Sequence, residues 1–207
     1  MDIWEANKMA TAFTAHPCSL TGDLRCEGRD CGDNEKGERY SGVCDKDGCD
    51  INPFRTGSPN FYGPGSQYSI DTTKPLTVVT QFITTDGTDH GDLKEIKRFW
   101  VQNGRRIETP MSNVPGVQAY NSLTDATCAA QKKVFGDNND FAAKGGMKRM
   151  GEALDRGMVL VMSIWDDHDA NMLWLDSQYP LDKPASNPGI ARGPCSRDSG
   201  KPQDVES

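Results

Sequence analysis

Seven cysteines constrain this 207-residue chain more than any other feature of its sequence, because five of them crowd into residues 18–49. That stretch is rich in glycine and aspartate and contains two C-x4-C pairs, so a zinc site is one interpretation. Structural zinc sites usually use C-x2–4-C spacing, and the longer spacing and acidic flanks favour disulfides instead. Disulfides indicate an oxidising compartment, hence a secreted, extracellular protein. Since seven is odd, at least one cysteine has no partner within the chain.

Short strands and turns dominate the sequence. The clearest strand is expected at residues 75–84, which are rich in β-branched side chains, and Asn103-Gly104 predicts a hairpin between strands at 96–102 and 105–108. The other expected elements are helices at 124–133 and 140–155, strands at 158–165 and 170–176, and loops over 8–70 and from Pro180 onward. With 21 glycines and 12 prolines, this pattern predicts a mainly β domain of sandwich or jelly-roll type.

The charge and hydrophobicity of the chain argue against two kinds of partner. A net charge of −7 argues against nucleic acid, because a polyanion requires a basic surface. No segment approaches the roughly 20 apolar residues of a membrane span, and no signal peptide begins at Met1. An acidic protein can still bind a neutral polymer through aromatic and hydroxyl contacts, and we expect a monomer.

Residues 1–7, Met-Asp-Ile-Trp-Glu-Ala-Asn, place two acids, Asp2 and Glu5, three positions apart beside Trp4. Residues three apart face opposite sides of a regular strand, so both acids can line one cleft only if the strand is bulged or ends between them. Glycoside hydrolysis uses two such carboxyls, one protonated and one ionised. The alternative is two solvated acids near a strand end. Candidate catalytic residues do not normally occupy the first positions of a domain. We therefore expect Met1 to be an internal methionine of a longer protein.

This segment resembles the active-site strand of the family 7 glycoside hydrolases, whose motif is Glu-x-Asp-x-x-Glu. The resemblance implies that Asp2 is the middle acid, which tunes the nucleophile, and that Glu5 is the acid/base. The nucleophile would be a glutamate immediately before Met1, so the chain as given is expected to be inactive. The segment around His16 is similar to one that places a histidine near the acid/base, whereas a lone histidine before proline is otherwise more often structural.

The resemblance extends over essentially the whole chain and implies further residues that bind sugar. The implied substrate-binding residues are Arg39, Asp47, Asp50, Arg55, Arg192, Trp165 and Trp174. The charged members would lie on the leaving-group and product side of the cleft, with Arg55 the weaker candidate; the alternative is a set of exposed loop charges. The two indoles would be platforms for glucosyl rings, whereas a tryptophan in a sandwich is more usually part of the core.

The family's cystine pattern implies the bonds Cys18–Cys44, Cys26–Cys31 and Cys49–Cys128, with Cys195 bonded to a cysteine upstream of the chain. The implied fold is a concanavalin A-like jelly-roll β-sandwich with long loops and a few short helices. Residues 1–207 would form about the C-terminal half of this catalytic domain, truncated at both ends. Half a sandwich leaves strand edges unpaired, so we expect that the chain does not fold alone.

The implied activity is hydrolysis of β-1,4-glucosidic bonds in cellulose or cello-oligosaccharides with retention, releasing cellobiose from chain ends, with reducing ends favoured, and without a metal or organic cofactor. The long 26–49 loop and the 179–192 segment resemble the tunnel-forming loops of cellobiohydrolases. Glu35 and Asp169 stand where such enzymes often carry tyrosines at opposing loop tips, so a looser roof is expected. Two alternatives stay open, namely an endoglucanase of the same family and a non-catalytic, lectin-like sandwich that binds glucan.

Two acidic clusters do not match metal sites. Asp45-x-Asp47-Gly48 resembles the start of a calcium loop, but glycine falls at the fourth position instead of the sixth. Position twelve is Thr56 and not glutamate, which excludes an EF-hand. The sequence Asp-Asp-His-Asp at 166–169 has residues that could bind a metal, but a solvated turn is the favoured interpretation.

Overall fold

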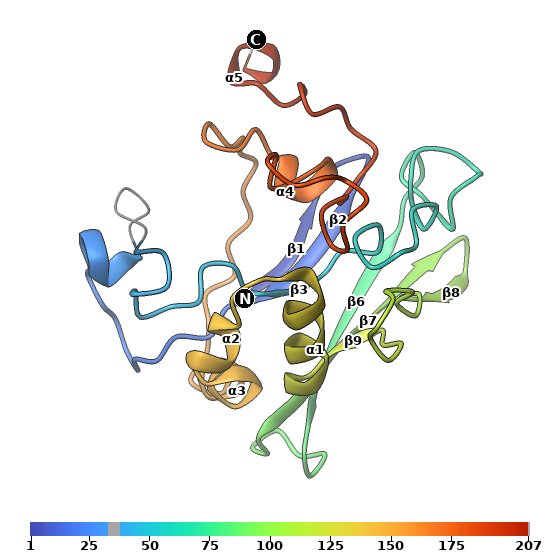
Figure 1. Ribbon diagram of the computed structural model, residues 1–207. Coiled ribbons are helices and arrows are strands. Elements are labelled where there is room, and N and C mark those ends of the chain that lie inside the picture. Colours follow the sequence, from blue (N-terminus) through green and yellow to red (C-terminus); the bar gives the residue numbers. More distant parts are fainter. Residues whose placement is uncertain (33–37, 207) are drawn as a thin grey trace.

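A computed structural model describes residues 1–32 and 38–206 of the chain (Figure 1). The strands are β1 (Asp2–Ala6), β2 (Thr11–Ala15), β3 (Cys49–Ile51), β4 (Tyr62–Gly63), β5 (Ile70–Asp71), β6 (Thr77–Thr84), β7 (Leu93–Gln102), β8 (Arg105–Glu108) and β9 (Ser122–Leu123). The helices are α1 (Asp125–Phe135), α2 (Asp140–Ala143), α3 (Gly146–Asp155), α4 (Leu173–Asp176) and α5 (Pro202–Val205), with a 3-10 turn at Gly28–Cys31. Glu35, predicted at a loop tip, lies outside the described residues.

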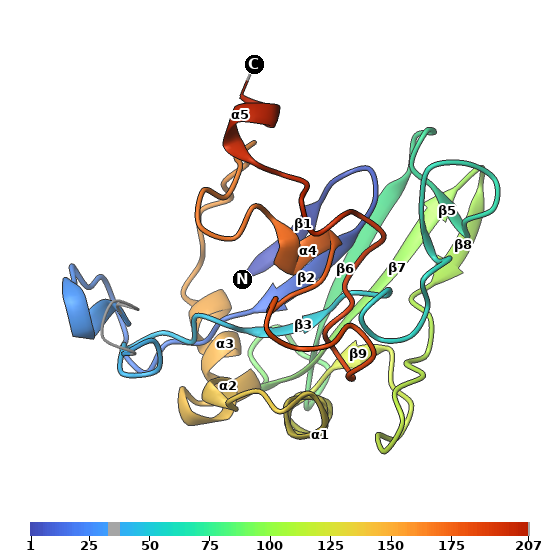
Figure 2. The same ribbon diagram turned by 45° about the horizontal axis from the view of Figure 1, so that its top comes forward.

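Two antiparallel sheets form the framework of the chain. The first has the order β1-β2-β3, and the second has the order β6-β7-β8, with β9 also paired to β7 (Figures 1 and 2). Phe13 of β2 and Ile51 of β3 share one buried cluster with Ile96 of β7 and Leu123 of β9. The two sheets therefore pack around a common hydrophobic core, which is the basis of a layered β domain.

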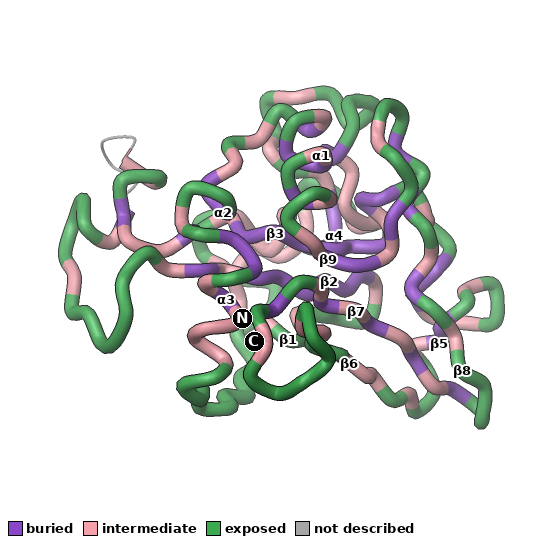
Figure 3. Tube along the Cα trace, turned by 90° about the horizontal axis from the view of Figure 1, so that it is seen from below, coloured by how far each residue is buried: buried purple, intermediate pink, exposed green. Residues whose placement is uncertain are grey.

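Strand β2 is covered on both faces, which fixes the orientation of the first sheet. All five of its residues are buried, and Figure 3 shows the buried stretches of the chain running through β2, β3, β7 and β9. Phe13 belongs to the common core, whereas Ala12 packs against Leu175 of α4. Because successive side chains of a strand alternate between its faces, the even-numbered residues of β2 point toward α4 and the odd-numbered ones toward the core.

The predicted hairpin and the strand before it are confirmed. Strand β6 occupies most of the predicted range 75–84, and β7 and β8 flank Asn103-Gly104. The φ angles of Asn103 and Gly104 are 53° and 73°, the left-handed values that a type I′ turn requires at both central positions. Buried residues alternate with less buried ones along β7, where Ile96 and Trp100 face inward.

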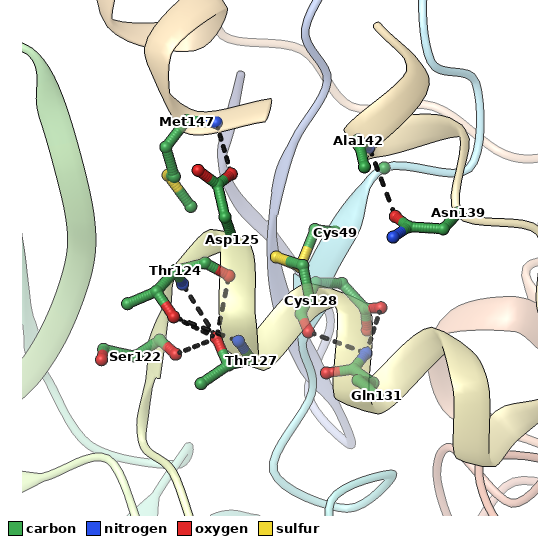
Figure 4. The surroundings of a disulfide bond; sticks show 12 residues. Cys49, Ser122, Thr124, Asp125, Thr127, Cys128, Gln131, Asn139, Ala142 and Met147 are labelled. Atoms are coloured by element: carbon green, nitrogen blue, oxygen red, sulfur yellow. Dashed lines mark hydrogen bonds between the residues drawn. A yellow bond between two sulfur atoms is a disulfide. The ribbon is translucent and has the colours of Figure 1, made fainter. Parts of the chain in front are cut away.

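Helix α1 confirms the prediction for 124–133, but the predicted helix at 140–155 is broken in two. Thr124 begins α1 with a capping box, in which its side chain accepts from the backbone N–H of Thr127 (Figure 4). Gly145 separates α2 from α3 with a φ of 99°, a conformation that other residues avoid. No helix in the described part of the chain is long and apolar enough to cross a membrane.

All three implied disulfides are present. Cys18 is joined to Cys44, Cys26 to Cys31, and Cys49 to Cys128. The last bond fastens α1 to β3 within the buried core (Figure 4). Six cysteines are thereby committed to disulfides, which removes the thiolates that a zinc site would need. Cys195 has no sulfur partner among the described residues.

The strand pair predicted at 158–165 and 170–176 is wrong. Residues 158–164 have no regular secondary structure, and they form the light orange trace between α3 and α4 in Figure 1. Val161 is 75 % exposed and Ile164 is 104 % exposed. A strand that is apolar on both faces needs neighbours on both, and the described residues supply none. Residues 173–176 form α4 instead of a partner strand.

The prediction of loops over 8–70 is wrong in part, because that range contains β2, β3 and β4 and the first residue of β5. These strands are two to five residues long, too short to show a hydrophobic period. Their backbone pairing, which depends on residues far along the chain, holds them in place. The tail from Pro180 is mainly loop, as predicted, with α5 as a single short helix.

Candidate active site

A β-bulge brings Asp2 and Glu5 to the same face of the first sheet. Glu5 lies opposite Ala12 of β2, and regular pairing from there would place Asp2 opposite Ala15, but Asp2 lies opposite Thr14. Opposite residues of an antiparallel pair share a face, and Ala12 and Thr14 are two positions apart and so share one as well. The register shift therefore puts both carboxylates on the α4 side, as the bulged-strand prediction requires.

Asp2 forms a hydrogen-bonded chain with His16 and the turn before β3. Its Oδ2 lies 2.8 Å from Nε2 of His16, and Nδ1 of His16 donates to the main-chain oxygen of Asp45 at 2.8 Å. The hydrogen bond from His16 lowers the pKa of Asp2. Burial alone would lower the pKa of His16, but its bonds to Asp2 and Asp45 outweigh burial and raise it. The pair therefore favours an ionised Asp2 beside a protonated His16.

Glu5 lies in a different environment from Asp2. Its Oε2 accepts a hydrogen bond from the hydroxyl of Thr14 at 2.8 Å. Burial is the largest cause that raises the pKa of Glu5, and the negative charges of Asp2 and Asp50 add to it. Two carboxyls whose pKa values are pushed apart by their surroundings can divide acid and base roles between them.

Asp50 and Arg55 meet inside the protein beside this face. Asp50 lies opposite Thr14 on β3, so it points to the same side of the sheet as Glu5. Nη1 of Arg55 lies 2.7 Å from Oδ1 of Asp50, Nη2 lies 2.8 Å from Oδ2 of Asp137, and Nε donates to the main-chain oxygen of Gly189 at 2.9 Å. The Arg55 side chain is only 3 % exposed. It therefore links β3, the end of α1 and the loop around Gly189 from inside the protein.

Arg192, on the loop that Arg55 holds, lies close to the second predicted tryptophan. Its Nη1 donates to the main-chain oxygen of Trp174 at 3.4 Å, and its Nε donates to that of Tyr179 at 3.3 Å. Burial lowers the pKa of Arg192 to about 10. Arg192 and Arg55 therefore lie on connected segments, with Asp50 and Asp137 offsetting their charges.

Arg39 and Asp47 form a separate ion pair on the neighbouring loops. Nε of Arg39 lies 2.5 Å from Oδ1 of Asp47, and the hydroxyl of Tyr40 donates to the other carboxylate oxygen at 2.8 Å. Burial would raise the pKa of Asp47, but the bond from Tyr40 and the charge of Arg39 together hold it below its ordinary value. The pair is partly exposed and presents both charges to solvent.

Trp165 and Trp174 stack on each other, with ring centroids 6.1 Å apart and an interplanar angle of 24°. Nε1 of Trp174 donates to Oδ2 of Asp167 at 2.9 Å, which orients the indole. Trp165 is 55 % exposed, whereas Trp174 is half-buried and packs against the cluster of Ala12 and Leu175, so neither indole belongs to the common core. Nearby, His168 lies 2.6 Å from Glu206 and 3.3 Å from Asp166, so the predicted turn at 166–169 carries ion pairs on the surface.

An open hollow of about 410 Å³ lies near β1 and is lined in part by Trp4, Ala6 and Tyr62. None of the predicted acids contributes to its lining. Trp4 precedes Glu5 directly in β1, so its side chain points to the opposite face of the sheet. This hollow is therefore on the core side of the sheet and not on the side of the carboxylates.

Several residues of the site were missed by sequence analysis. Thr14 could have been found from the alternation of β2 if its pairing with β1 had been known. Asp45, Asp137 and Asp167 join the site through contacts to residues at least seven positions away, and no local pattern announces such contacts.

Comparison with known proteins identifies the family. The sequence model of Glycosyl hydrolase family 7 matches residues 1–207. A crystal structure of a GH7 family cellobiohydrolase from Daphnia pulex is similar with a TM-score of 0.97 and 62 % identity, covering 99 % of this chain and 46 % of that one. The cellobiohydrolase of Melanocarpus albomyces, complexed with cellotetraose, has a TM-score of 0.88 and 42 % identity over 100 % and 45 % of the two chains.

An endocellulase from Humicola insolens is also similar, with a TM-score of 0.82 and 38 % identity over 99 % of this chain and 45 % of that one. The chain thus spans slightly less than half the length of each of these relatives. The similarity confirms the predicted mainly β sandwich with few short helices. By sequence and by structure, the chain belongs to glycosyl hydrolase family 7.

Proposed function

We propose that this chain forms part of the catalytic domain of a secreted, retaining cellulase that releases cellobiose from the ends of cellulose chains. Glu5 is the acid/base, and Asp2 tunes a glutamate nucleophile supplied by the residue before Met1 in the longer protein. The observation that carries this proposal is the bulge that turns Asp2 and Glu5 to one face of the sheet. Secretion is supported by the three disulfides.

The surroundings of the two acids suit these roles. Burial raises the pKa of Glu5, which favours a protonated carboxyl that can donate to the leaving-group oxygen. His16 favours an ionised Asp2, which can accept a hydrogen bond from the nucleophile while that group is protonated. In a retaining enzyme, Glu5 and the nucleophile would lie about 5–5.5 Å apart.

The residues around this face suit a neutral, hydroxyl-rich polymer. Trp165 and Trp174 offer flat apolar surfaces that match the C–H faces of glucosyl rings, and their segments meet in one place. Arg39, Asp47 and Arg192 supply charged hydrogen-bonding groups for sugar hydroxyls on the product side. The buried Arg55 and Asp50 support this side by holding the loop that carries Arg192. The relative complexed with cellotetraose supports cello-oligosaccharides as the ligand class.

The test uses the longer protein that contains this chain, with Glu5→Gln as the variant. Hydrolysis of cellobiosides with poor leaving groups should fall by at least roughly 100-fold, in line with the worth of a general acid. Glycosylation from activated aryl cellobiosides should be spared, because their leaving groups need no proton. An equal loss on both substrates would remove Glu5 from the acid/base role. Cello-oligosaccharide binding without any hydrolysis by the unaltered protein would favour the lectin-like alternative.

An endoglucanase is the second candidate, and the similarity to the Humicola insolens endocellulase supports it. Asp169 in place of a loop-tip tyrosine also favours a more open roof. The product pattern on soluble cellulose separates the two. A cellobiohydrolase releases mainly cellobiose with a slow fall in viscosity, whereas an endoglucanase lowers the viscosity early and yields mixed oligosaccharides.

A further inference from the structure

The turn at residues 45–48, just before β3, contacts the partners of both candidate acids. Asp45 is 1 % exposed, and its Oδ1 accepts from the backbone N–H groups of Asp47 at 3.2 Å and Gly48 at 3.0 Å, which closes the turn. The main-chain oxygen of Asp45 accepts from Nδ1 of His16 at 2.8 Å. One short turn is therefore fixed by its own side chain and holds the histidine through its backbone.

The contact with Asp45 fixes where the protons of His16 lie. A carbonyl oxygen has no hydrogen to donate, so Nδ1 of His16 carries a proton. Nε2 faces Oδ2 of Asp2 at 2.8 Å, and that bond also needs one proton between its two atoms. Either His16 is an imidazolium beside an ionised Asp2, or a neutral His16 accepts from a protonated Asp2. In both states the lone pair of Nδ1 is unavailable, and the ring is held toward Asp2.

Gly48 supplies the space in which these partners sit. Its φ is 69°, and a Cβ at this position would meet the Cγ2 methyl of Thr14 and would lie 2.6 Å from Cε1 of His16. Thr14 is the residue that donates to Glu5, and His16 is the one that pairs with Asp2. The absence of a side chain at one position thus leaves room for the hydrogen-bond partners of both acids.

We infer that the Asp45–Gly48 turn is a positioning element of this site, which holds His16 in its Nδ1–H form toward Asp2 and leaves Thr14 free to reach Glu5. The inference rests on the proposed function for its catalytic meaning, but its geometry can be tested without activity. None of the four residues of the turn touches the reacting atoms in this scheme. The effect of Asp45 and Gly48 passes through His16 and Thr14, whereas Asp47 also offers its carboxylate to the product-side sugar.

The first test is ¹⁵N NMR of the imidazole nitrogens in the longer protein that contains this chain, in which a His16→Gln variant assigns the His16 signals. We expect His16 to show a protonated Nδ1 across the pH range in which this protein stays folded. Gly48→Ala should shift the His16 signals and weaken the Nδ1–H signal through faster exchange. Gly87→Ala is the matched control, because Gly87 has a similar φ of 74° and nothing within 4 Å of an added Cβ.

A second pair of variants covers the case in which Gly48→Ala does not fold. Asp45→Asn retains an oxygen that can accept from both amides of the turn, whereas Asp45→Ala removes it. The His16 signals should survive in the asparagine variant and move or broaden in the alanine variant. A neutral His16 with its proton on Nε2 would overturn the inference, and so would His16 signals that do not change in Gly48→Ala or Asp45→Ala.

Activity of the longer protein separates this inference from the proposed function. Gly48→Ala should lower kcat on poor leaving groups by roughly 10- to 100-fold with a smaller change in KM, as expected for a displaced catalytic group, and Gly87→Ala should not. If the NMR result holds but Glu5→Gln shows no dependence on the leaving group, the proposed function fails and the positioning of His16 stands. If Glu5→Gln behaves as proposed while Gly48→Ala keeps full activity, the positioning role is the part that is wrong.

Discussion

The guanidinium of Arg55 and the carboxylate of Asp50 form a salt bridge inside the protein, with 2.7 Å between Nη1 and Oδ1. The ring of Phe135 covers the guanidinium, whose central carbon lies 4.4 Å from the ring centroid. Because Arg55 also holds the oxygen of Gly189, this bridge ties the loop that carries Arg192 to the sheet that carries the candidate acids. The proposed sugar-binding and catalytic segments are therefore coupled through a pair that solvent scarcely reaches.

In the longer protein that contains this chain, replacement of Arg55 by methionine should lower the free energy of unfolding by about 3–5 kcal/mol, because Asp50 would be left as a buried charge without its partner. The free energy of unfolding in urea measures the loss. Lys148→Met is the control, since Lys148 and its partner Asp92 are 65 % and 57 % exposed and such pairs contribute at most about 1 kcal/mol. Equal losses of unfolding free energy in the two variants would show that burial of the Arg55–Asp50 salt bridge does not increase its contribution to stability.

Glu5→Gln should raise the free energy of unfolding at neutral pH. Burial raises the folded-state pKa of Glu5, so the ionised form costs stability above the ordinary value of 4.5, and glutamine removes that cost while still accepting from Thr14. Below the ordinary value both side chains are neutral, and the difference should vanish. Urea unfolding from pH 3 to pH 8 checks this, and a gain that is the same at every pH would contradict it.

The Asp2–His16 pair should stabilise the longer protein within a limited pH window. The lowered pKa of Asp2 gives stability above its ordinary value of 3.8 that is lost as the pH falls through the folded-state value. The raised pKa of His16 gives stability below its ordinary value of 6.5 that is lost as the pH rises through the folded-state value. The difference between the unaltered chain and His16→Gln should therefore be largest between these two pH values.

Thermal unfolding across the pH range measures this window. His90→Gln is the control, because His90 is 89 % exposed and its nearest carboxylate, on Asp155, lies 3.6 Å away. Its effect on the melting temperature should be small throughout. A His16→Gln effect without a maximum between the two ordinary values would show that the ion pair is not the source of the stability.

The Cys49–Cys128 bond should contribute more to stability than the other disulfides. It closes a span of 79 residues, for which the chain-entropy model gives roughly 4 kcal/mol, whereas Cys26–Cys31 closes a span of five. Paired alanine variants of each bond, compared by urea unfolding, test the difference. A larger loss of stability in the Cys26–Cys31 variant than in the Cys49–Cys128 variant would contradict the prediction. It would show that strain, or residual structure in the unfolded chain, outweighs the entropy of loop closure.

The apolar segment at residues 158–165 should make the 207-residue chain bind hydrophobic dye and self-associate, because it is exposed and unpaired. Val161→Lys should reduce both dye fluorescence and the associated fraction in analytical ultracentrifugation. Val205→Lys, at an exposed position outside the segment, is the control. Association that responds equally to both variants would point to a different surface.

Much of this protein could be predicted from local sequence. The hairpin at Asn103-Gly104 and helix α1 follow from turn chemistry and capping, which act within a few residues. The spacing of Asp2 and Glu5 allowed one shared face only if the strand was bulged or ended between them, and the structure has the bulge. The family and the fold followed from the resemblance that the motifs carry, and the cystine pairs were implied by that resemblance.

Tertiary structure alone decided the rest. Residues 158–165 have the composition of a buried strand, yet a strand requires neighbours, and none of the described residues pairs with them. The main-chain oxygen of Asp45 became the partner of His16, and Asp137 became a partner of Arg55, through contacts that no sequence pattern encodes. Sequence determines which groups are available and how the chain turns locally; the protonation of His16 and Glu5 depends on which distant atoms the fold brings within hydrogen-bonding distance and on how much water it excludes.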